Sequence, residues 1–309
     1  MVENELLAVC DENMVGFVFT NYNNSQFTIQ ALQSIFASPA VGRCFVVVVD
    51  NCSTNEEVKV LLEAKSLHAN IRIVENRHNV GYFRGLNVGI EYLRSRFSNL
   101  STIVVGNNDL VFPVDFIGLL DRNKHLFEKY PVISPDIVTL DGVHQNPHVI
   151  MGTSRFREFV WDAYFSNYYL ARAISRISAV TRRLTERKDY HTHKISQPIY
   201  QGYGACYILT KCFFGNFELL WAPTFLMGEE FFLAKQIESK GYRVFYEPDI
   251  LVRHHDHAAV SKLPSRKLWE ITKRYHKIYR KFITPYKVKM VANYRYPDCL
   301  LDCQNESNE

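Results

Sequence analysis

Three short apolar runs, each followed by asparagine or aspartate, constrain the fold of this chain more than any other feature. The runs and the polar residues that follow them are 15–20 with Asn21, 45–49 with Asp50, and 103–105 with the triplet Asn107, Asn108 and Asp109. Uniformly apolar runs of this length are typical of parallel strands that are covered on both faces. Helical patterns lie between them, so the sequence predicts an α/β fold with a doubly wound, mostly parallel sheet and helices on both faces.

The polar residues that follow these strands predict a binding crevice. Because the carboxyl ends of parallel strands meet at one edge of an open sheet, ligands of such folds bind there. Asp109 would present a hard oxygen ligand, which suits Mg²⁺ or Mn²⁺ carried by a diphosphate. For the triplet alone, the alternative is a capped strand end or an Asx turn.

Composition and charge limit the class of protein. The 309 residues are 47% hydrophobic and 22% charged, which is ordinary for a globular protein, and the net charge of +4 is too small to indicate a nucleic-acid partner. Seven cysteines without a C-x-x-C pair favour reduced thiols in a cytosol. The acidic N-terminus does not resemble a signal peptide, and no stretch reaches the roughly 18 apolar residues of a membrane-spanning helix. We expect a cytoplasmic protein, either soluble or peripheral on the cytoplasmic face of the inner membrane.

Residues 168–188 form a distinct basic segment. Apolar residues recur at helical spacing on one side, and arginines occupy much of the rest. A basic amphipathic helix can lie on an anionic membrane surface. The alternative is a helix that packs on the core and has a solvated outer side.

Several short motifs occur in a fixed order along the chain. They are Thr20-Asn21-Tyr22-Asn23, Val48-Val49-Asp50-Asn51-Cys52-Ser53-Thr54, Asn79-Val80-Gly81 through Asn87, Asn107-Asn108-Asp109, and Gly228-Glu229-Glu230 followed by Pro248-Asp249 through His254. In this order they resemble the family 2 glycosyltransferases with a GT-A fold, especially the rhamnosyltransferase-like branch that builds bacterial surface polysaccharides. The resemblance covers roughly residues 15–257. It implies a nucleotide-binding half over residues 1–112, an acceptor-binding and catalytic half over 113–260, and a C-terminal helical extension with a polar tail over 261–309.

The resemblance also implies a nucleotide-sugar donor carrying UDP or dTDP. Thr20 and Tyr22 would flank the nucleobase, and Tyr22 would stack on it. Asp50 would accept the imino N–H of uracil or thymine, which selects those bases over cytosine. Arg84 would contact the diphosphate, in place of the arginine that the family often carries at the position of Leu86.

A divalent cation follows from the same resemblance. Asp109 would hold Mn²⁺ or Mg²⁺ between the two phosphates, and Asn108 would lie near the ribose or the sugar. The cation would neutralise the charge that grows on the leaving nucleoside diphosphate. His254 would supply a further metal ligand. His255 and His257 compete with it for this role, and a solvated loop is the alternative for those two.

The resemblance places the general base at Glu230, with Glu229 beside it. Inverting transfer needs a base that takes the proton of the acceptor hydroxyl as its oxygen attacks the anomeric carbon opposite the leaving group. Two adjacent carboxylates in a partly closed crevice would raise one of their pKa values, which suits a base. The alternative is a pair of helix caps favoured by the helix dipole. The chain departs from the family at Phe232 and Gln236, where an acidic residue and an arginine are common.

The sequence therefore predicts an inverting, metal-dependent glycosyltransferase. The expected acceptor is a glycan, in particular a lipid-linked glycan at the cytoplasmic membrane, with the helix at 168–188 serving as a membrane contact. A sugar nucleotidyltransferase is a weaker alternative, because the loop after the first strand has no glycine, lysine or arginine. A non-catalytic nucleotide-sugar- or glycan-binding subunit is a third, supported only by the two departures. A Rossmann dehydrogenase would need a G-x-G-x-x-G motif after the first strand, and this chain has none there.

Overall fold

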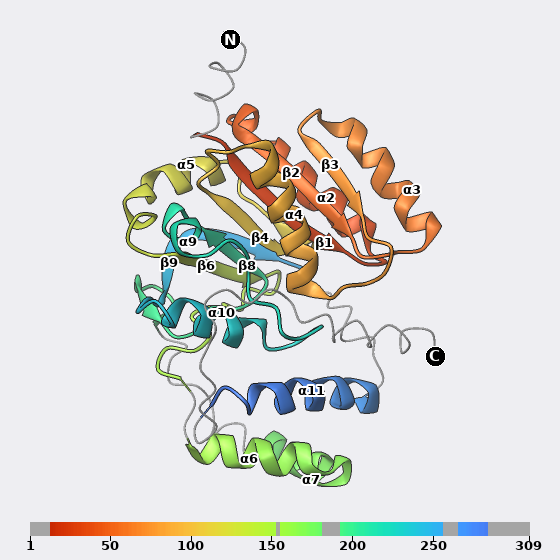
Figure 1. Ribbon diagram of the computed structural model, residues 1–309, viewed down its shortest axis with the longest axis vertical. Helices are drawn as coiled ribbons and strands as arrows, with labels where there is room; N and C mark the ends of the chain where they lie inside the picture. Colours follow the sequence, from red (N-terminus) through yellow and green to blue (C-terminus); the bar gives the residue numbers. More distant parts are fainter. Residues whose placement is uncertain (1–12, 153–154, 181–191, 256–264, 284–309) are drawn as a thin grey trace.

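The computed structural model describes residues 13–152, 155–180, 192–255 and 265–283. In these residues a nine-stranded sheet has the order β3-β2-β1-β4-β8-β6-β9-β5, and β7 pairs with β9. Helices cover both faces of the sheet, and three further helices lie together at one end of the molecule (Figure 1).

The first half of the sheet has the parallel arrangement that the sequence predicts. Its elements are β1 (Val15–Asn21), α2 (Ser25–Phe36), η1 (Val41–Arg43), β2 (Cys44–Asp50), α3 (Asn55–Ala64), η2 (Lys65–Leu67), β3 (Ile71–Glu75), α4 (Tyr82–Arg96) and β4 (Ile103–Asn107). Strands β3, β2, β1 and β4 are parallel neighbours. Their carboxyl ends therefore meet at one edge, where Asn21 is in register with Asp50 and Thr20 with Asn107.

The second half of the sheet is mixed. Its elements are β5 (Leu110–Val111), α5 (Phe116–Arg122), η3 (Lys124–Leu126), β6 (Val132–Thr139), β7 (Gln197–Ile199), β8 (Cys206–Leu209), α9 (Lys211–Asn216), α10 (Glu229–Glu238) and β9 (Val244–His254). Strand β8 is antiparallel to both β4 and β6, β6 is parallel to β9, and β5 and β7 are antiparallel to β9. The predicted parallel arrangement is thus present from β3 to β4 and ends where β8 pairs antiparallel with β4.

The apolar runs at 149–151, 242–246 and 250–252 predict three further strands, and all three differ in the structure. The strands expected at 242–246 and 250–252 are one strand, β9, which stays paired with β6 across a register shift between Pro135 and Asp136. A proline cannot donate to the ladder, so an irregularity at that point is expected. The strand considered near 149–151 is only an isolated bridge between Val149 and Gln201.

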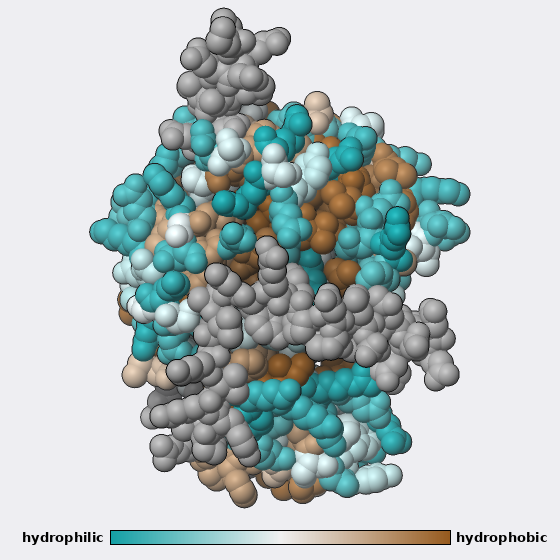
Figure 2. All heavy atoms as spheres, in the orientation of Figure 1, coloured by the Kyte–Doolittle hydropathy of each residue, from teal (hydrophilic) through white to brown (hydrophobic). Residues whose placement is uncertain are grey.

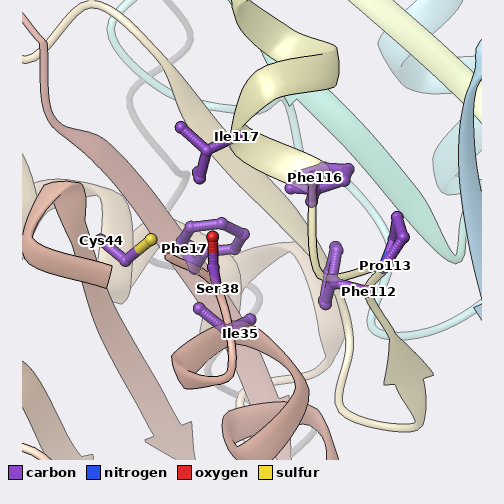
Figure 3. A pocket seen from close by; sticks show the side chains of 8 residues that line it. All are labelled: Phe17, Ile35, Ser38, Cys44, Phe112, Pro113, Phe116 and Ile117. Carbon is purple, nitrogen blue, oxygen red and sulfur yellow. The ribbon is translucent and has the colours of Figure 1, made fainter. Parts of the chain in front are cut away.

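Two hydrophobic clusters fill the two faces of the sheet. The cluster under α2, α3 and α5 includes Phe17, Leu32 and Leu61, and the cluster under α4 and α10 includes Leu86 and Leu233. Figure 3 shows a hollow in the first cluster. Its eight lining residues are Phe17, Ile35, Ser38, Cys44, Phe112, Pro113, Phe116 and Ile117. This lining is almost entirely apolar, so the hollow belongs to the core and not to the polar strand ends.

The remaining helices are α6 (Arg155–Ser166), α7 (Tyr168–Val180) and α11 (Ser265–Tyr279). Helix α11 lies between the sheet domain and the α6–α7 pair (Figure 1). The basic helix predicted over 168–188 is present up to Val180, and residues 181–188 lie outside the described residues. In the part of the chain that the structure describes, each helix is too short or too polar to cross a bilayer.

Helix α11 belongs to the predicted C-terminal helical extension. It packs against α6, which comes from the middle of the chain. Glu158 and Asp162 of α6 both pair with Arg280, and Asp162 also accepts a hydrogen bond from His276. Tyr279 joins the small aromatic cluster that links α11 to α10. The three helices therefore form one group, in which α11 joins the α6–α7 pair to α10.

Candidate functional site

Asp109 and His254, separated by 145 residues, face each other at the carboxyl edge of the sheet. Nε2 of His254 lies 3.1 Å from Oδ1 of Asp109, and both side chains are buried. The contact follows from strand pairing, since Leu110 of β5 is in register with His254 of β9 and the N–H of His255 donates to the carbonyl of Asp109. The structure thus brings together the two side chains that were predicted to bind a metal.

The other ring nitrogen of His254 sets its tautomer. Nδ1 lies 2.8 Å from Oε1 of Gln145, an oxygen that only accepts, so Nδ1 carries the proton and Nε2 offers a lone pair. That lone pair and the Asp109 carboxylate then face each other as two acceptors. A cation suits this arrangement, because imidazole and carboxylate are both ligands for Mn²⁺. The donor set therefore fits the predicted metal.

The protein supplies part of a coordination shell only. Within the described residues, no group of three or more His, Cys, Asp or Glu side chains could hold a metal ion. A six-coordinate cation held by Asp109 and His254 would need about four further ligands from diphosphate oxygens and water. Of the competing histidines, the ring of His255 packs 5.7 Å from that of Phe27, and His257 lies outside the described residues.

Glu229 and Glu230 begin α10 after a turn with left-handed backbone at Met227 and Gly228. Glu229 is buried, and its Oε1 has no hydrogen-bond partner among the described residues. Burial and the charge of Glu230 raise the pKa of Glu229 to about 8. Burial also raises the pKa of Glu230, and the backbone N–H groups of Glu230 and Gly204 oppose that rise. The pKa values of both carboxyl groups are therefore raised, as expected for carboxyl groups in a closed crevice.

Tyr82 connects these carboxyl groups to the strand ends. Its hydroxyl donates to the carbonyl of Gly204 at 2.9 Å. Burial raises the pKa of Tyr82, and the charges of Glu229, Glu230 and Asp109 raise it further, so all three carboxyl groups lie within electrostatic reach of one phenol.

The loop around Gly204 joins the same two regions. A methyl group built on Gly204 would lie 2.7 Å from Oε1 of Glu230. The next residue, Ala205, accepts a hydrogen bond from the N–H of Asn107 at the end of β4. The start of α10 and the end of β4 are thus at the same edge of the sheet.

Sequence reasoning missed Tyr82, although it lies inside the motif at 79–87.

The predicted nucleobase residues also lie at this edge. Asp50 is buried, and its two carboxylate oxygens accept hydrogen bonds from Asn21 Nδ2 and Ser53 N, each at 2.9 Å. Each oxygen retains a second lone pair that a base could use. Thr20 is half-buried on the neighbouring strand, and the side chain of Tyr22 is exposed. Their contacts with a nucleobase remain predictions.

Asn108 has structural contacts that the sequence did not indicate. Its buried Nδ2 donates to Asn24 Oδ1 at 2.8 Å and to Thr28 Oγ1 at 2.7 Å. These bonds fasten the start of α2 to the end of β4 and keep the strand-end loops together. The predicted contact of Asn108 with the ribose or sugar stays a prediction.

Arg84 lies in the first turn of α4, and its Nε donates to the carbonyl of Ala222 at 3.3 Å. Leu86, at the position where the family often has an arginine, is fully buried in the core. An arginine at this fully buried position would lack a solvated or paired environment for its charge. Leucine at position 86 therefore suits the apolar packing around it. A contact between Arg84 and a diphosphate remains a prediction.

Both departures from the family pattern have a packing explanation. Phe232 is fully buried and packs edge-on against Trp221, with ring centroids 5.1 Å apart. Gln236 accepts a hydrogen bond from the N–H of Trp221 and donates to the carbonyl of Leu219. The two residues hold α10 against the segment at 219–221.

Comparison with known proteins agrees with this fold. The family model "Glycosyl transferase family 2" matches residues 17–123, which run from β1 to the end of α5. The prediction of a GT-A fold is confirmed, and the family match supports a glycosyltransferase. The match covers 107 of the 309 residues, about a third of the chain. The rhamnosyltransferase-like branch stays a prediction.

Solved structures with the same fold are distant in sequence. GalNAc-T7 with UDP, GalNAc and Mn²⁺ matches 79% of this chain with 12% identity and a TM-score of 0.52. The mannosyltransferase PcManGT from Pyrobaculum calidifontis, in complex with GDP-Man and Mn²⁺, matches 86% with 14% identity and a TM-score of 0.52. TarS 1-349 of S. aureus in complex with UDP-GlcNAc matches 87% with 12% identity and a TM-score of 0.50.

The alignments span 44%, 64% and 66% of those three chains, respectively. No curated protein matches the sequence significantly.

Proposed function

We propose that this protein is an inverting, metal-dependent glycosyltransferase that moves a sugar from a UDP- or dTDP-sugar to a glycan hydroxyl. The acceptor would be a lipid-linked glycan of cell-surface polysaccharide synthesis, on the cytoplasmic side of the inner membrane. The observation that carries the proposal is the meeting of Asp109, His254 and the Glu229–Glu230 pair at one edge of the sheet, around Tyr82. The family match supports the reaction class.

The donor would bind in the half formed by residues 1–112. Thr20, Tyr22 and Asp50 would hold the base at the ends of β1 and β2, where Asp50 is already oriented by Asn21 and Ser53. Arg84 at the start of α4 would reach the diphosphate, close to the positive end of the helix dipole. Asn108 would keep the strand-end loops in place and border the ribose or sugar.

Asp109 and His254 would hold Mn²⁺ or Mg²⁺. When bound, a divalent cation neutralises negative charge on the leaving diphosphate. The hydrogen bond between Gln145 and Nδ1 of His254 would keep Nε2 directed at that position. Two solved structures of the same fold contain Mn²⁺ with a nucleotide or nucleotide sugar, which supports a divalent cation here.

Glu230 would act as the general base in the half formed by residues 113–260. It would take the proton of the acceptor hydroxyl while the oxygen bonds to the anomeric carbon and the bond from that carbon to the diphosphate breaks on the opposite face. Glu229, with a pKa of about 8, would remain protonated near neutral pH. A neutral Glu229 would limit the repulsion that a second carboxylate exerts on an ionised Glu230.

The alternative of a non-catalytic subunit is weaker than the proposed enzyme. It depended on Phe232 and Gln236, and both side chains serve packing between α10 and the segment at 219–221.

Donor hydrolysis tests the proposed function directly. We would incubate the purified protein and Mn²⁺ with a panel of UDP-, dTDP- and GDP-sugars and measure the release of nucleoside diphosphate. One UDP- or dTDP-sugar should be hydrolysed slowly, and Asp109→Ala should remove this activity. If no donor of the panel binds or is hydrolysed, the proposed function is wrong.

A further inference from the structure

Helices α6 and α7 expose an unusual amount of apolar surface. Five large apolar side chains on these two helices have between 43% and 76% of their surface exposed: Phe156, Phe159, Tyr169, Leu170 and Ile177. Monomeric proteins rarely leave large apolar side chains clustered in this way, and such patches mark contact surfaces.

The exposed residues follow the periodicity of the two helices. Tyr169, Ala173 and Ile177 are spaced four apart on α7 and form one exposed stripe, and Arg172 and Arg176 form an exposed row beside it. The residues of α7 include no aspartate or glutamate. On α6, Phe156 and Phe159 are three apart and share a face. Apolar and cationic groups therefore alternate over this surface.

The acidic residues of α6 take part in contacts with α11. Nη1 of Arg280 lies 2.9 Å from Oε2 of Glu158, and Nε2 of His276 lies 2.8 Å from Oδ1 of Asp162. Their negative charge is thus balanced where α6 meets α11. The arginines of α7 and the aromatic residues Phe156, Phe159 and Tyr169 remain exposed.

The same surface lies at one end of the molecule. Helices α6 and α7 are side by side beyond α11, on the side away from the sheet (Figure 1). Figure 2 shows apolar patches between hydrophilic ones at that end. A flat partner could therefore approach both helices together.

We propose that the exposed surface of α6 and α7, defined by Phe156, Phe159, Tyr169, Arg172 and Arg176, docks on an anionic lipid bilayer. Aromatic and aliphatic side chains would enter the boundary between headgroups and acyl chains, and the arginines would bind anionic headgroups. This use goes beyond the proposed reaction, because it involves neither the donor nor the strand ends. The sequence pattern indicated a membrane contact for α7 alone, and the structure adds the two phenylalanines of α6.

Charge complementarity favours a bilayer over a second copy of this chain. A two-fold interface with its axis through the Arg172 and Arg176 row would place the row of one copy near that of the other, and like charges at close range oppose association. An anionic membrane offers the opposite charge over a flat area.

Co-sedimentation of the full chain with vesicles tests the proposal. The protein should bind vesicles of phosphatidylcholine with added phosphatidylglycerol, and bind vesicles of phosphatidylcholine alone much less. The double variant Arg172→Gln with Arg176→Gln should weaken binding about tenfold or more. The double variant Phe156→Ser with Phe159→Ser should weaken binding by a similar factor, since each buried aromatic ring contributes apolar area.

A matched control comes from α3, on the sheet domain. Leu62→Ser with Lys59→Gln changes one exposed apolar and one exposed basic residue there and should leave vesicle binding unchanged. Thermal melting of each variant shows whether it still folds. Hydrolysis of a soluble donor should be unchanged in all of them, so loss of vesicle binding is separable from failure of the proposed reaction.

Two results would overturn the proposal. The first is equal binding of the wild type and the α6 and α7 variants to anionic vesicles, or no binding at all. The second is a concentration-dependent dimer in analytical ultracentrifugation that the α6 and α7 variants abolish while vesicle binding is absent, which would assign the surface to a second copy.

Discussion

Glu230 and Glu229 are neighbours in the chain but have different surroundings. Glu230 is half-buried beside Gly204, whereas Glu229 is buried with one oxygen lacking a partner among the described residues. A base must reach the acceptor hydroxyl, so the more accessible carboxylate is the better candidate. We expect Glu230→Gln to lower the rate of sugar transfer by at least about 100-fold, because a general base contributes about 10²–10⁴.

The isosteric change at Glu230 should leave donor affinity nearly unchanged, and isothermal titration with the nucleotide sugar and Mn²⁺ measures this. Glu229→Gln is the matched control, and it should retain more activity than Glu230→Gln. Transfer that survives in Glu230→Gln would place the base at another residue.

The burial of Glu229 predicts a pH dependence of stability. Burial and the charge of Glu230 raise its pKa from an ordinary 4.5 to about 8. Between these values the folded state keeps a proton that the unfolded state has lost, so the free energy of unfolding falls as the pH rises from about 4.5 to about 8. Denaturant unfolding at several pH values measures this slope. Glu229→Gln has no titratable group there and should flatten the slope; an unchanged slope would contradict the assignment.

Gln145 predicts a positioning effect on metal binding. Its Oε1 fixes the proton of His254 on Nδ1 and so directs Nε2 at Asp109. Partners of this kind typically affect metal affinity by about 10- to 100-fold. We expect Gln145→Ala to weaken Mn²⁺ binding by this factor, as measured from the electron paramagnetic resonance of free Mn²⁺. Gln30→Ala, an exposed glutamine on α2, should have no effect, and equal affinities for the two variants would exclude the role of Gln145.

Part of the site could be predicted from the sequence, and the reason differs between residues. Asp109 and His254 lie in motifs at strand ends, and the pairing of β5 with β9 brings them together as expected. Gln145 lies in a proline-punctuated segment with no periodic pattern, so only the three-dimensional contact reveals it. Tyr82 was inside a recognised motif, but its hydrogen bond to Gly204 joins segments 122 residues apart.

At the scale of elements, the sequence is informative where each strand is covered on both faces. Strands β1, β2 and β4 are uniformly apolar, and their predicted ranges agree closely with the structure. Strand β9 was predicted as two strands because Glu247, Pro248 and Asp249 interrupt its apolar pattern. Pairing with β6 and β7 overrides that local signal. Helix α10 begins at Glu229, which puts both carboxyl groups in its first turn.

The turn before α10 predicts that adding one methyl group at Gly228 lowers both stability and activity. Gly228 has φ of +76°, and a Cβ built there would lie 1.9 Å from Cε2 of Tyr275 in α11. Gly228→Ala should therefore both strain the backbone and displace α11 from the carboxyl pair. We expect lower activity and a loss of stability well above the about 1–2 kcal/mol that left-handed backbone costs an alanine.

Gly241 offers a matched control for that change. It has φ of +81°, but a Cβ there would meet no atom within 4 Å. Gly241→Ala should cost about 1–2 kcal/mol and leave activity unchanged. Thermal melting and donor hydrolysis compare the two variants, and similar losses in both would show that the contact with Tyr275 is unimportant.

At the scale of the whole molecule, α11 connects the carboxyl pair of α10 with the exposed helices α6 and α7, which are distant from each other in the sequence. Tyr275 packs on Gly228 beside the carboxyl pair, and burial together with Glu230 and Glu229 raises the pKa of its phenol. On its other side, His276 and Arg280 pair with α6. The sequence showed α11 only as a basic aromatic helix, because its partners are distant in the chain. The proposed membrane surface and the proposed base thus share one supporting helix.

The incomplete ligand set predicts that metal and nucleotide stabilise the whole molecule together. Asp109 and His254 supply two ligands, and the remaining positions would be filled by diphosphate oxygens and water. Mn²⁺ alone and UDP alone should therefore bind weakly and raise the melting temperature little. Together, at about 100 times their dissociation constant, they should stabilise the folded state by about 2.7 kcal/mol and raise the melting temperature by about 4 °C.

Differential scanning fluorimetry with UDP, dTDP and GDP, each with and without Mn²⁺, measures this coupling. UDP or dTDP should give the larger shift, since Asp50 is expected to accept the imino N–H of uracil or thymine. In His254→Ala the joint shift should fall towards the sum of the two separate shifts, because the cation then has one protein ligand fewer. Purely additive shifts in the wild type would mean that metal and nucleotide bind at separate places, and the shared site at the ends of β4 and β9 would be wrong.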